Sequence, residues 1–521
     1  MVNDELAKIE KVKRVFRSIS LFSQLVIGFP LRQYQIDPAD AVIESCVHNR
    51  GIEFLWVFPR QSGKDEAVAQ MLAYLLSMFH RTEAQMIHVY PTQMQTATGV
   101  TRLERRLDNI LTRSYSWSKN RPKRIGVERS QCYFFSGHEQ SRAEGATANL
   151  LLVVNEVQDC DEVVIERRFT PMRASTNASA LFVGTVRTTS DYLWRVKTRL
   201  EKLEAKDGIK RVWFVSPGEV GKENMFYQQF VHNQILMKGR QHPSVKSELF
   251  NEPVDTAAGL FPDRRLALMR GRHVRQAGPS QGEVYVAMLD VGGQDEAATE
   301  AFSDLDNPGR DYTVLTICRV NLDGASSVGP TYEVVDVFTD QGSRHFQSFP
   351  GKPSLFDRLL ALLDHWRPVA TVVDMSGVGQ GVTDALIEQH SGAVFGFDFS
   401  KNHGKARLGN DFLAIVETGR FKYFEGGGEG SDSWWFFTQA EFCGYELAEG
   451  VPIERGLRWG VRAGVKTQLS AGGVIAVHDD RLLSAALVAH VEELRLDGKI
   501  FFSTGESAII SITDREDQGW N

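Results

Sequence analysis

The sequence predicts an α/β protein of two domains, the first with a mainly parallel sheet and the second with a mixed sheet. The chain of 521 residues is longer than one hydrophobic core usually serves. Between residues 52 and 217 short apolar runs alternate with helical patterns, as in strands joined by crossover helices. From residue 284 three apolar runs follow one another before the alternation resumes. This order predicts neighbouring strands with short connections, and therefore strands of mixed direction.

The composition is that of a soluble globular protein. Hydrophobic residues make up 42% and charged residues 24% of the chain, and no apolar run reaches the roughly 18 to 20 residues that span a bilayer. The first residues resemble neither a secretory signal nor a transit peptide. Five dispersed cysteines favour a reduced cytoplasm without structural zinc. The net charge of −7 predicts no overall attraction to nucleic acid, so any contact with DNA must come from local basic patches.

The first domain is expected to cover residues 1–251. Its apolar positions before residue 20 have helical spacing and predict an N-terminal amphipathic helix. A helical pattern at residues 67–79 follows the first apolar run. The expected strands are Ile52–Phe58, Gln85–Tyr90, Gln131–Phe135, Leu150–Val154, Ala180–Val183 and Arg211–Val215.

The second domain is expected to cover residues 283–521, after a linker at residues 252–282. The linker contains two proline-bearing turns and five arginines, and it interrupts the rhythm of strands and helices. The second domain is expected to contain a helix at Leu355–Trp366. Its expected strands are Val284–Leu289, Tyr312–Val320, Tyr332–Phe338 and Val369–Val373.

A candidate phosphate-binding loop follows the first strand. The segment Arg60, Gln61, Ser62, Gly63, Lys64 and Asp65 lies between that strand and a helical pattern. In such a P-loop (Walker A), backbone N–H groups and the helix N-terminus face the phosphates, and the lysine reaches the β- and γ-oxygens. The sequence of this loop departs from the general P-loop motif, because Phe58 replaces the first glycine and Asp65 replaces the metal-binding Ser or Thr. The alternative is an ordinary strand-turn-helix with a surface lysine.

The strand at residues 150–154 ends in an amide and a carboxylate, Asn155 and Glu156. In P-loop motors a strand-end aspartate holds the metal and the following glutamate polarises the attacking water. Glu156 fits the second role, whereas Asn155 lacks the charge for the first. We therefore hypothesise that Asp65 supplies from the loop the carboxylate that is missing from the strand. The alternative is a degenerate site that hydrolyses ATP poorly.

A second candidate site consists of aspartates far apart in the sequence. Asp290 and Asp374 each end an apolar strand, and Asp479 and Asp480 stand at the start of a helical run. Carboxylates in such positions can converge on a pair of hard cations, which activate water for phosphodiester hydrolysis. The order of these residues predicts an RNase H-like nuclease fold.

Several neighbouring features have two interpretations. The glycines at 377, 379 and 381 follow a strand, but their spacing is not that of a dinucleotide-binding loop. Asp311 is either an auxiliary metal ligand or a solvated turn residue. His478 either orients an adjacent aspartate or simply ends a strand.

Taken together, these segments resemble the large terminase subunit of tailed bacteriophages and prophages, over about residues 30–495. The loop at Arg60–Lys64 is similar to that family's own phosphate loop. Further similar segments are residues 31–35, 89–92, 141–145 and 184–185 in the first half, and 374–379 and 478–487 in the second. The resemblance implies an ASCE-type P-loop ATPase domain followed by a RuvC-like, RNase H-like nuclease domain.

The resemblance also implies roles for individual residues. Gln35 would contact adenine, Lys64 the phosphates, and Arg142 the γ-phosphate in the same or a neighbouring subunit. Glu156 would act on the attacking water, and Thr185 would belong to the coupling motif. The nuclease ligands would be Asp290, Asp374 and Asp479 or Asp480. The implied cofactors are ATP with Mg²⁺ in the motor and two Mg²⁺ or Mn²⁺ ions in the nuclease.

By the same resemblance, the chain would translocate double-stranded DNA into a procapsid and cut concatemeric DNA. Its partners would be the small terminase subunit and the portal protein, on which it would form a homo-oligomeric ring. It would work in the host bacterial cytoplasm, docked transiently on the portal, and would not be part of the virion. Two alternatives remain open: a nuclease whose ATPase domain is only a scaffold, and a P-loop helicase or remodeller that does not cleave DNA.

Three basic stretches are candidates for contact with DNA phosphates. They are Arg102, Arg105 and Arg106, the run at residues 119–124, and the arginines of the expected linker. Each phosphate that is neutralised adds affinity that depends on salt, and a motor that must release DNA at each step gains nothing from a strong static grip. The alternative for each stretch is a solvated surface.

Overall fold

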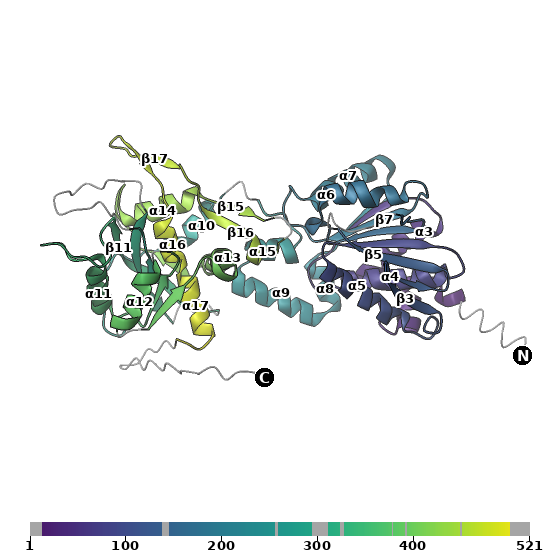
Figure 1. The fold of residues 1–521 in the computed structure, drawn as a ribbon, viewed down its shortest axis with the longest axis horizontal. Coiled ribbons are helices and arrows are strands. Elements are labelled where there is room, and N and C mark those ends of the chain that lie inside the picture. The colour runs from purple at the N-terminus through teal and green to yellow at the C-terminus, as the bar shows by residue number, and fades with distance from the viewer. Residues whose placement is uncertain are drawn as a thin grey trace, which may run out of the picture. The chain divides into compact units, whose positions relative to one another are not determined.

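The chain folds into two compact units in a computed structural model (Figure 1). The structure describes residues 13–137, 145–255, 259–293, 311–322, 328–377, 379–390, 393–448 and 451–500. The first unit comprises Met1–Asn233 and Pro243–Asp255, and the second comprises Gln234–His242 and Thr256–Asn521. No helix among the described residues is long and apolar enough to cross a membrane.

The first unit is built on an eight-stranded sheet with the order β3-β4-β5-β2-β6-β7-β1-β8. Its pairs are parallel from β5 to β8, while β3, β4 and β5 pair antiparallel. The strands are β1 Glu53–Val57, β2 Gln85–Tyr90, β3 Ser116–Asn120, β4 Lys123–Val127, β5 Ser130–Ser136, β6 Leu151–Asn155, β7 Ser179–Gly184 and β8 Val212–Phe214. The prediction of a mainly parallel sheet is therefore confirmed.

Helices cover this sheet on both faces, as Figure 1 shows. Because both faces are covered, the central strands β6 and β7 are buried along their whole length and read as continuous apolar runs. The helices of this unit are α2 Ile19–Phe22, α3 Gln33–Val47, α4 Lys64–Met78, α5 Gln93–Leu107, α6 Glu162–Val164, α7 Tyr192–Asp207 and α8 Pro217–Glu223, with shorter turns η1 Ser23–Ile27, η2 Val157–Asp159, η3 Ile165–Phe169, η4 Thr170–Arg173 and η5 Val245–Leu249. Helix α9, Met225–Lys238, has residues in both units.

Helix α4 carries the lysine of the predicted phosphate loop. The helix has 15 residues with no internal glycine or proline, and twelve of them are buried. It begins after Gly63, whose φ of +84° lies in the left-handed region that glycine adopts without strain. A helix packed on most of its circumference holds its first turn firmly against the sheet.

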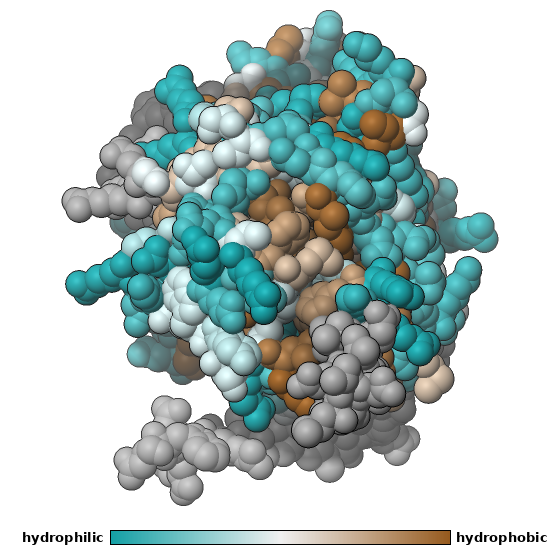
Figure 2. All heavy atoms as spheres, turned by 90° about the vertical axis from the view of Figure 1, so that its right-hand side faces the viewer, coloured by the Kyte–Doolittle hydropathy of each residue, from teal (hydrophilic) through white to brown (hydrophobic). Residues whose placement is uncertain are grey.

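Part of the apolar surface of the first unit is exposed. Figure 2, a view from the right-hand side of Figure 1, shows apolar residues gathered in a hollow that polar side chains surround. Large apolar side chains with more than half of their surface exposed include Leu25, Phe29, Met94 and Ile110. Phe29 lies under the guanidinium of Arg106, with 5.0 Å between the guanidinium carbon and the ring centroid.

The second unit is built on a six-stranded mixed sheet with the order β13-β12-β9-β10-β11-β14. Strands β9, β10 and β11 pair antiparallel, and β12, β13 and β14 join by parallel pairs. The strands are β9 Val284–Asp290, β10 Tyr312–Asn321, β11 Thr331–Gln341, β12 Ala370–Asp374, β13 Val394–Phe397 and β14 Phe421–Tyr423. The mixed sheet that the three consecutive apolar runs predicted is confirmed.

The remaining elements of the second unit are helices and two small hairpins. The helices are α10 Asp263–Met269, α11 Leu355–Trp366, α12 Gly379–Gln389, α13 Gly404–Glu417, α14 Asp432–Phe442, α15 Ile453–Gly456, α16 Asp480–Ala486 and α17 Val488–Leu496, with a 3-10 turn η6 Lys401–His403. The hairpins are β15 Cys443–Leu447 with β16 Leu457–Val461, and β17 Lys466–Gln468 with β18 Val474–Ala476. The end of α11 at Trp366 agrees with the predicted helix.

The segment expected to be a linker, residues 252–282, contributes structure to the second unit. Helix α10 lies within it, and Arg265 of this helix is buried and paired with Glu417 of α13 at 2.7 Å. The chain leaves the first unit after Asp255, and from Thr256 onward it belongs to the second unit. A division into a motor domain ending at residue 251 and a nuclease domain starting at residue 283 stays a prediction.

Candidate active sites

The loop between β1 and α4 is held in one shape by contacts from its own unit. Its left-handed positions are Gln61, with φ +64°, and Gly63. Phe58 is not among them and buries its side chain, so a glycine is not required there. The hydroxyl of Tyr34 donates to the carbonyl oxygen of Ser62 at 2.6 Å. The loop is therefore a fixed turn that opens onto the N-terminus of α4, the geometry that suits an anion.

Lys64 and Glu156 meet at the carboxyl edge of the sheet. The ammonium of Lys64 lies 2.8 Å from Oε1 of Glu156 and donates to the hydroxyl of Thr185 at 3.0 Å. Gln158 joins the group, because its amide donates to Glu156 and its oxygen accepts from the backbone N–H of Thr185. These residues follow β1, β6 and β7, which are neighbours in the sheet. Arg142, expected to contact the γ-phosphate, lies outside the described residues.

Two of the residues that depart from the P-loop motor pattern, Asp65 and Asn155, touch each other. Nδ2 of Asn155 donates to Oδ1 of Asp65 at 2.9 Å. Oδ2 of Asp65 lies 3.1 Å from Nη1 of Arg102 on α5. Burial raises the pKa of Asp65, but Lys64, Asn155 and Arg102 together lower it by more than burial raises it. The net pKa is therefore below its ordinary value. Asp65 is therefore an ionised carboxylate at neutral pH.

Gln35 and Arg60 both contact protein groups near the loop. The amide of Gln35 donates to the carbonyl oxygen of Gly63 at 3.0 Å, and its oxygen accepts from the backbone N–H of Arg32. Gln35 therefore lies beside the loop, where the resemblance expects a contact with adenine. Arg60 points to Glu248, with its Nη1 2.6 Å from the carboxylate. These two residues tie the loop to α3 and to η5.

In the second unit, Asp290 and Asp374 end adjacent strands. Strand β12 pairs parallel with β9, and Val373 lies opposite Leu289. Because parallel strands end at the same edge of a sheet, the two aspartates share that edge. Both are buried, and the backbone N–H of Ser376 donates to Asp374 at 2.8 Å.

The carboxylates of this edge act on one another. Burial raises the pKa of Asp290 well above its ordinary value, and the charges of Asp480, Asp374, Asp479 and Asp311 raise it further. Burial, more than any charge, also raises the pKa of Asp374. Asp374, Asp479 and Asp480 therefore lie close enough to Asp290 to influence its pKa, although 190 residues separate Asp290 from Asp480.

Asp311 and His478 lie beside Asp480. Ligand atoms of Asp311, His478 and Asp480 all lie within 4.8 Å of one another. Nδ1 of His478 is 3.1 Å from Asp311, and the backbone N–H of Tyr312 donates to Asp480 at 3.0 Å. Of the two interpretations that the sequence left open, the structure favours a place for Asp311 and His478 beside the aspartates.

The donor set of this edge fits hard divalent cations. Carboxylate oxygens are the ligands that Mg²⁺ and Mn²⁺ prefer, and buried carboxylates that repel one another are stabilised by a cation between them. Asp479 differs from its neighbours, because its carboxylate lies 3.7 Å from the ammonium of Lys405. Asp480 is therefore the better placed of the two adjacent aspartates for a metal ion.

The pH dependence of thermal unfolding should show the raised pKa of Asp480. Burial raises the pKa of Asp480 from 3.8 to about 7, so the metal-free native state holds a proton that the unfolded state releases. The resulting stability is present below the unfolded pKa and is lost as the pH rises through about 7. We expect Tm without metal to fall more between about pH 5 and about pH 8 in the native chain than in Asp480→Asn.

Added Mn²⁺ should reverse this loss. Since metal binding requires ionised ligands, the increase in Tm on adding Mn²⁺ should be larger at about pH 8 than at about pH 6. Equal Tm changes in the native chain and in Asp480→Asn, with and without Mn²⁺, would remove Asp480 from the cation site.

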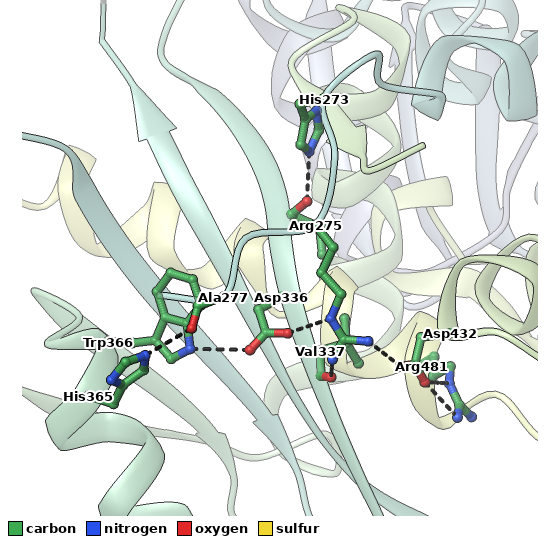
Figure 3. A network of polar contacts seen from close by, with 10 residues as sticks. His273, Arg275, Ala277, Asp336, Val337, His365, Trp366, Asp432 and Arg481 are labelled. Carbon is green, nitrogen blue, oxygen red and sulfur yellow. Dashed lines mark hydrogen bonds and ion pairs between the residues drawn. The ribbon is translucent and has the colours of Figure 1, made fainter. Parts of the chain in front are cut away.

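A network of ion pairs supports the helix that carries Asp480. Figure 3 shows Arg275 between two carboxylates, Asp336 of β11 and Asp432 of α14. Its nitrogens lie 2.7 Å from Asp336 and 3.1 Å from Asp432. Asp432 also accepts from Arg481 at 3.0 Å, and the indole of Trp366 donates to Asp336 at 3.2 Å. The network joins the expected linker, the sheet and the start of α16.

Arg481 connects this network of ion pairs to Tyr312, the residue that binds Asp480. Its guanidinium carbon lies 5.3 Å from the ring centroid of Tyr312, whose backbone N–H holds Asp480. The first turn of α16 is fixed further by Gln439, whose oxygen accepts from the backbone N–H of Leu482. Buried ion pairs and hydrogen bonds of this kind hold a site in a defined geometry.

Sequence reasoning did not find several of these contacts. Arg102 was expected to contact DNA, but it lies against Asp65, and Arg106 pairs with Glu66 at 2.7 Å. Arg105 is exposed on the same helix. Gln158, two residues after Glu156, gave a weak signal because it follows the acidic strand end. Lys405 gave none, because only the fold brings it to Asp479.

The fold and the two groups of residues define a class: an α/β chain with a candidate phosphate loop in one unit and neighbouring carboxylates in the other. Neither protein-family models nor curated proteins match the chain. Among solved structures, the large terminase of a thermophilic bacteriophage is 14% identical, covering 89% of this chain and 99% of its own, with a TM-score of 0.41. The HK97 bacteriophage large terminase is 12% identical, covering 91% and 99%, with a TM-score of 0.37. The large terminase nuclease of the thermophilic phage G20c, with bound magnesium, is 14% identical, covering 44% and 96%, with a TM-score of 0.29.

Proposed function

We propose that the chain is the large terminase subunit of a tailed phage or prophage. It would be an ATP-driven translocase of double-stranded DNA joined to a metal-dependent endonuclease. The observation that supports this most strongly is that each predicted set of residues assembles within one unit. Lys64, Glu156 and Thr185 meet in the first unit. In the second, Asp290 and Asp374 end paired strands, and Asp480 lies close enough to raise the pKa of Asp290.

In the motor, Lys64 would change its partner when nucleotide binds. Its ammonium forms an ion pair with Glu156. Phosphates bound at the N-terminus of α4 compete for the ammonium, and Glu156 is then released to accept a proton from the attacking water. Thr185, which follows β7 and contacts Lys64, is placed to respond to this exchange. Hydrolysis would thus change contacts at the edge of the sheet.

In the nuclease, the aspartates hold the metal site together. A pair of divalent ions bound there would activate water and stabilise the leaving oxygen of a phosphodiester. Asp290 and Asp374 provide carboxylates from rigid strands, and Asp480 provides one from α16. Asp311 and His478 are hydrogen-bonded to each other beside Asp480.

The implied partners follow from the proposed function. Duplex DNA would be the substrate of both units, the small terminase subunit would choose the start site, and the portal protein of the procapsid would anchor a ring of copies. The chain would act in the host cytoplasm and would leave before the virion is complete. Arg121 and Lys119 of the β3–β4 hairpin are exposed, so this basic stretch is available to DNA phosphates.

Two activities of one purified chain test the proposal. We expect duplex DNA to stimulate ATP turnover, and supercoiled plasmid to be cut when Mn²⁺ is present. Cutting without any ATP turnover would favour a nuclease with a scaffold domain. Turnover stimulated by DNA without cutting would favour a helicase or remodeller. Absence of both activities would contradict the proposed function.

A further inference from the structure

The phosphate loop and the strand beside it depart together from the general P-loop pattern. In that pattern a hydroxyl follows the loop lysine and an aspartate ends the acidic strand, and both face the Mg²⁺ that accompanies ATP. Here a carboxylate, Asp65, follows the lysine and an amide, Asn155, ends β6. Because the two side chains are hydrogen-bonded at 2.9 Å, the departures form one local arrangement.

Charge explains why these two departures occur together. An aspartate at position 155 would put two carboxylates in contact, and one of them would then have to take up a proton. The amide of Asn155 avoids this, because its Nδ2 donates a hydrogen bond to Asp65. The pair therefore carries a single negative charge, the same charge that one strand-end aspartate would bring.

The amide oxygen of Asn155 gives a second, independent indication of a ligand. Asn155 is 2% exposed, and its Oδ1 has no hydrogen-bond partner within the described parts of the chain. A buried amide oxygen without a donor is costly. It is also a hard ligand of the type that Mg²⁺ prefers. The amide oxygen of Asn155 and the carboxylate of Asp65 thus belong to two hydrogen-bonded side chains, one of them next to the loop lysine in the sequence.

Arg102 provides a positive charge next to Asp65. Its Nη1 lies 3.1 Å from Oδ2 of Asp65, and its side chain is one third exposed. The exposed fraction leaves the guanidinium a path to solvent when a cation approaches. A flexible arginine on the surface of α5 can be displaced at modest cost, because partly exposed ion pairs contribute little to stability.

We propose that Asp65 and Oδ1 of Asn155 together hold the divalent cation that accompanies ATP, and that Arg102 occupies Asp65 until this cation binds. Compared with the general P-loop pattern, the carboxylate ligand would come from the loop and not from the strand. The neutral oxygen ligand would come from the strand and not from the loop. The inference rests on the proposed nucleotide site and assigns its cation ligands.

Binding of Mn²⁺ tests the assignment without relying on catalysis. Electron paramagnetic resonance would count the Mn²⁺ ions that the full chain binds only when ADP is present. We expect Asp65→Ser to weaken this binding about tenfold or more, and the double variant Asp65→Ser with Asn155→Asp to restore it to within about threefold. Unchanged binding in Asp65→Ser, or a double variant as weak as the single one, would overturn the proposal.

Arg102 gives a test that does not alter the buried pair. Arg102→Ala should raise the nucleotide-dependent affinity for Mn²⁺ about threefold or more, because a competing cation is removed. Arg105→Ala, on the exposed side of the same helix, is the matched control and should leave the affinity unchanged. Equal affinities in Arg102→Ala and the native chain would contradict the role given to Arg102.

A metal-free binding assay separates this inference from the function on which it rests. Binding of a fluorescent ADP analogue would be measured in EDTA. If the native chain binds no nucleotide, the proposed motor site is wrong. If nucleotide binds but the Mn²⁺ affinities do not follow the pattern above, only the cation assignment is wrong.

Discussion

Replacing Asp374 with asparagine should lower the rate of plasmid cleavage by at least about 100-fold. Asparagine keeps the shape of the side chain and can still accept the hydrogen bond from Ser376. It removes one negative charge from the edge where Asp290 and Asp374 lie. The measurement is the rate at which supercoiled plasmid disappears in the presence of Mn²⁺.

Thermal unfolding separates a loss of catalysis in Asp374→Asn from a loss of folding. In the metal-free chain Asp374 adds to the repulsion that raises the pKa of Asp290, so asparagine at this position should leave Tm unchanged or raise it. Asp364→Asn is the matched control, since Asp364 is exposed on α11 of the same unit, and it should cut like the native chain. Cleavage by Asp374→Asn at the native rate would remove the nuclease assignment.

Replacing Lys64 with alanine should lower ATP turnover by at least about 100-fold, equivalent to about 2.7 kcal/mol of transition-state stabilisation. The ammonium lies at the N-terminus of α4, in contact with Glu156 and Thr185. Alanine therefore removes both the charge that reaches the phosphates and the partner that holds Glu156 before ATP binds. Release of inorganic phosphate in the presence of duplex DNA measures the effect.

The control for this variant lies on the surface of the same unit. Lys222→Ala changes an exposed lysine in the last turn of α8 and should leave turnover unchanged. Plasmid cleavage by Lys64→Ala in the absence of ATP should also remain, because the aspartate cluster belongs to the second unit. ATP turnover by Lys64→Ala at the native rate would contradict the proposed motor site.

Much of the fold could be predicted because buried strands leave a clear pattern. Strands β6 and β9 are apolar up to their polar last residues, Asn155 and Asp290, and the helix α11 has a regular apolar face. The hairpin of β3 and β4 was missed for the opposite reason. Strand β3 lies at the edge of its sheet and consists of Ser, Trp, Ser, Lys and Asn, so it shows no apolar alternation and was interpreted as a basic surface run.

The candidate sites could be predicted only as far as strand ends allow. Asp290 and Asp374 follow buried strands, and the rule that parallel strands end at one edge brings them together. The contact between Asp311 and His478 joins residues 167 positions apart, and no local pattern encodes it. The position of Arg102 against Asp65 likewise depends on how α4 and α5 pack, so a basic residue on a helical face was taken for a DNA contact.

The central claim is that one chain carries a DNA-dependent motor and a separate nuclease. ATP turnover by Asp374→Asn, with and without duplex DNA, tests this most directly, because the variant should be unable to cut the DNA that stimulates it. We predict that duplex DNA raises its turnover as it does for the native chain. Turnover that is absent, or that does not respond to DNA in either protein, would contradict the account.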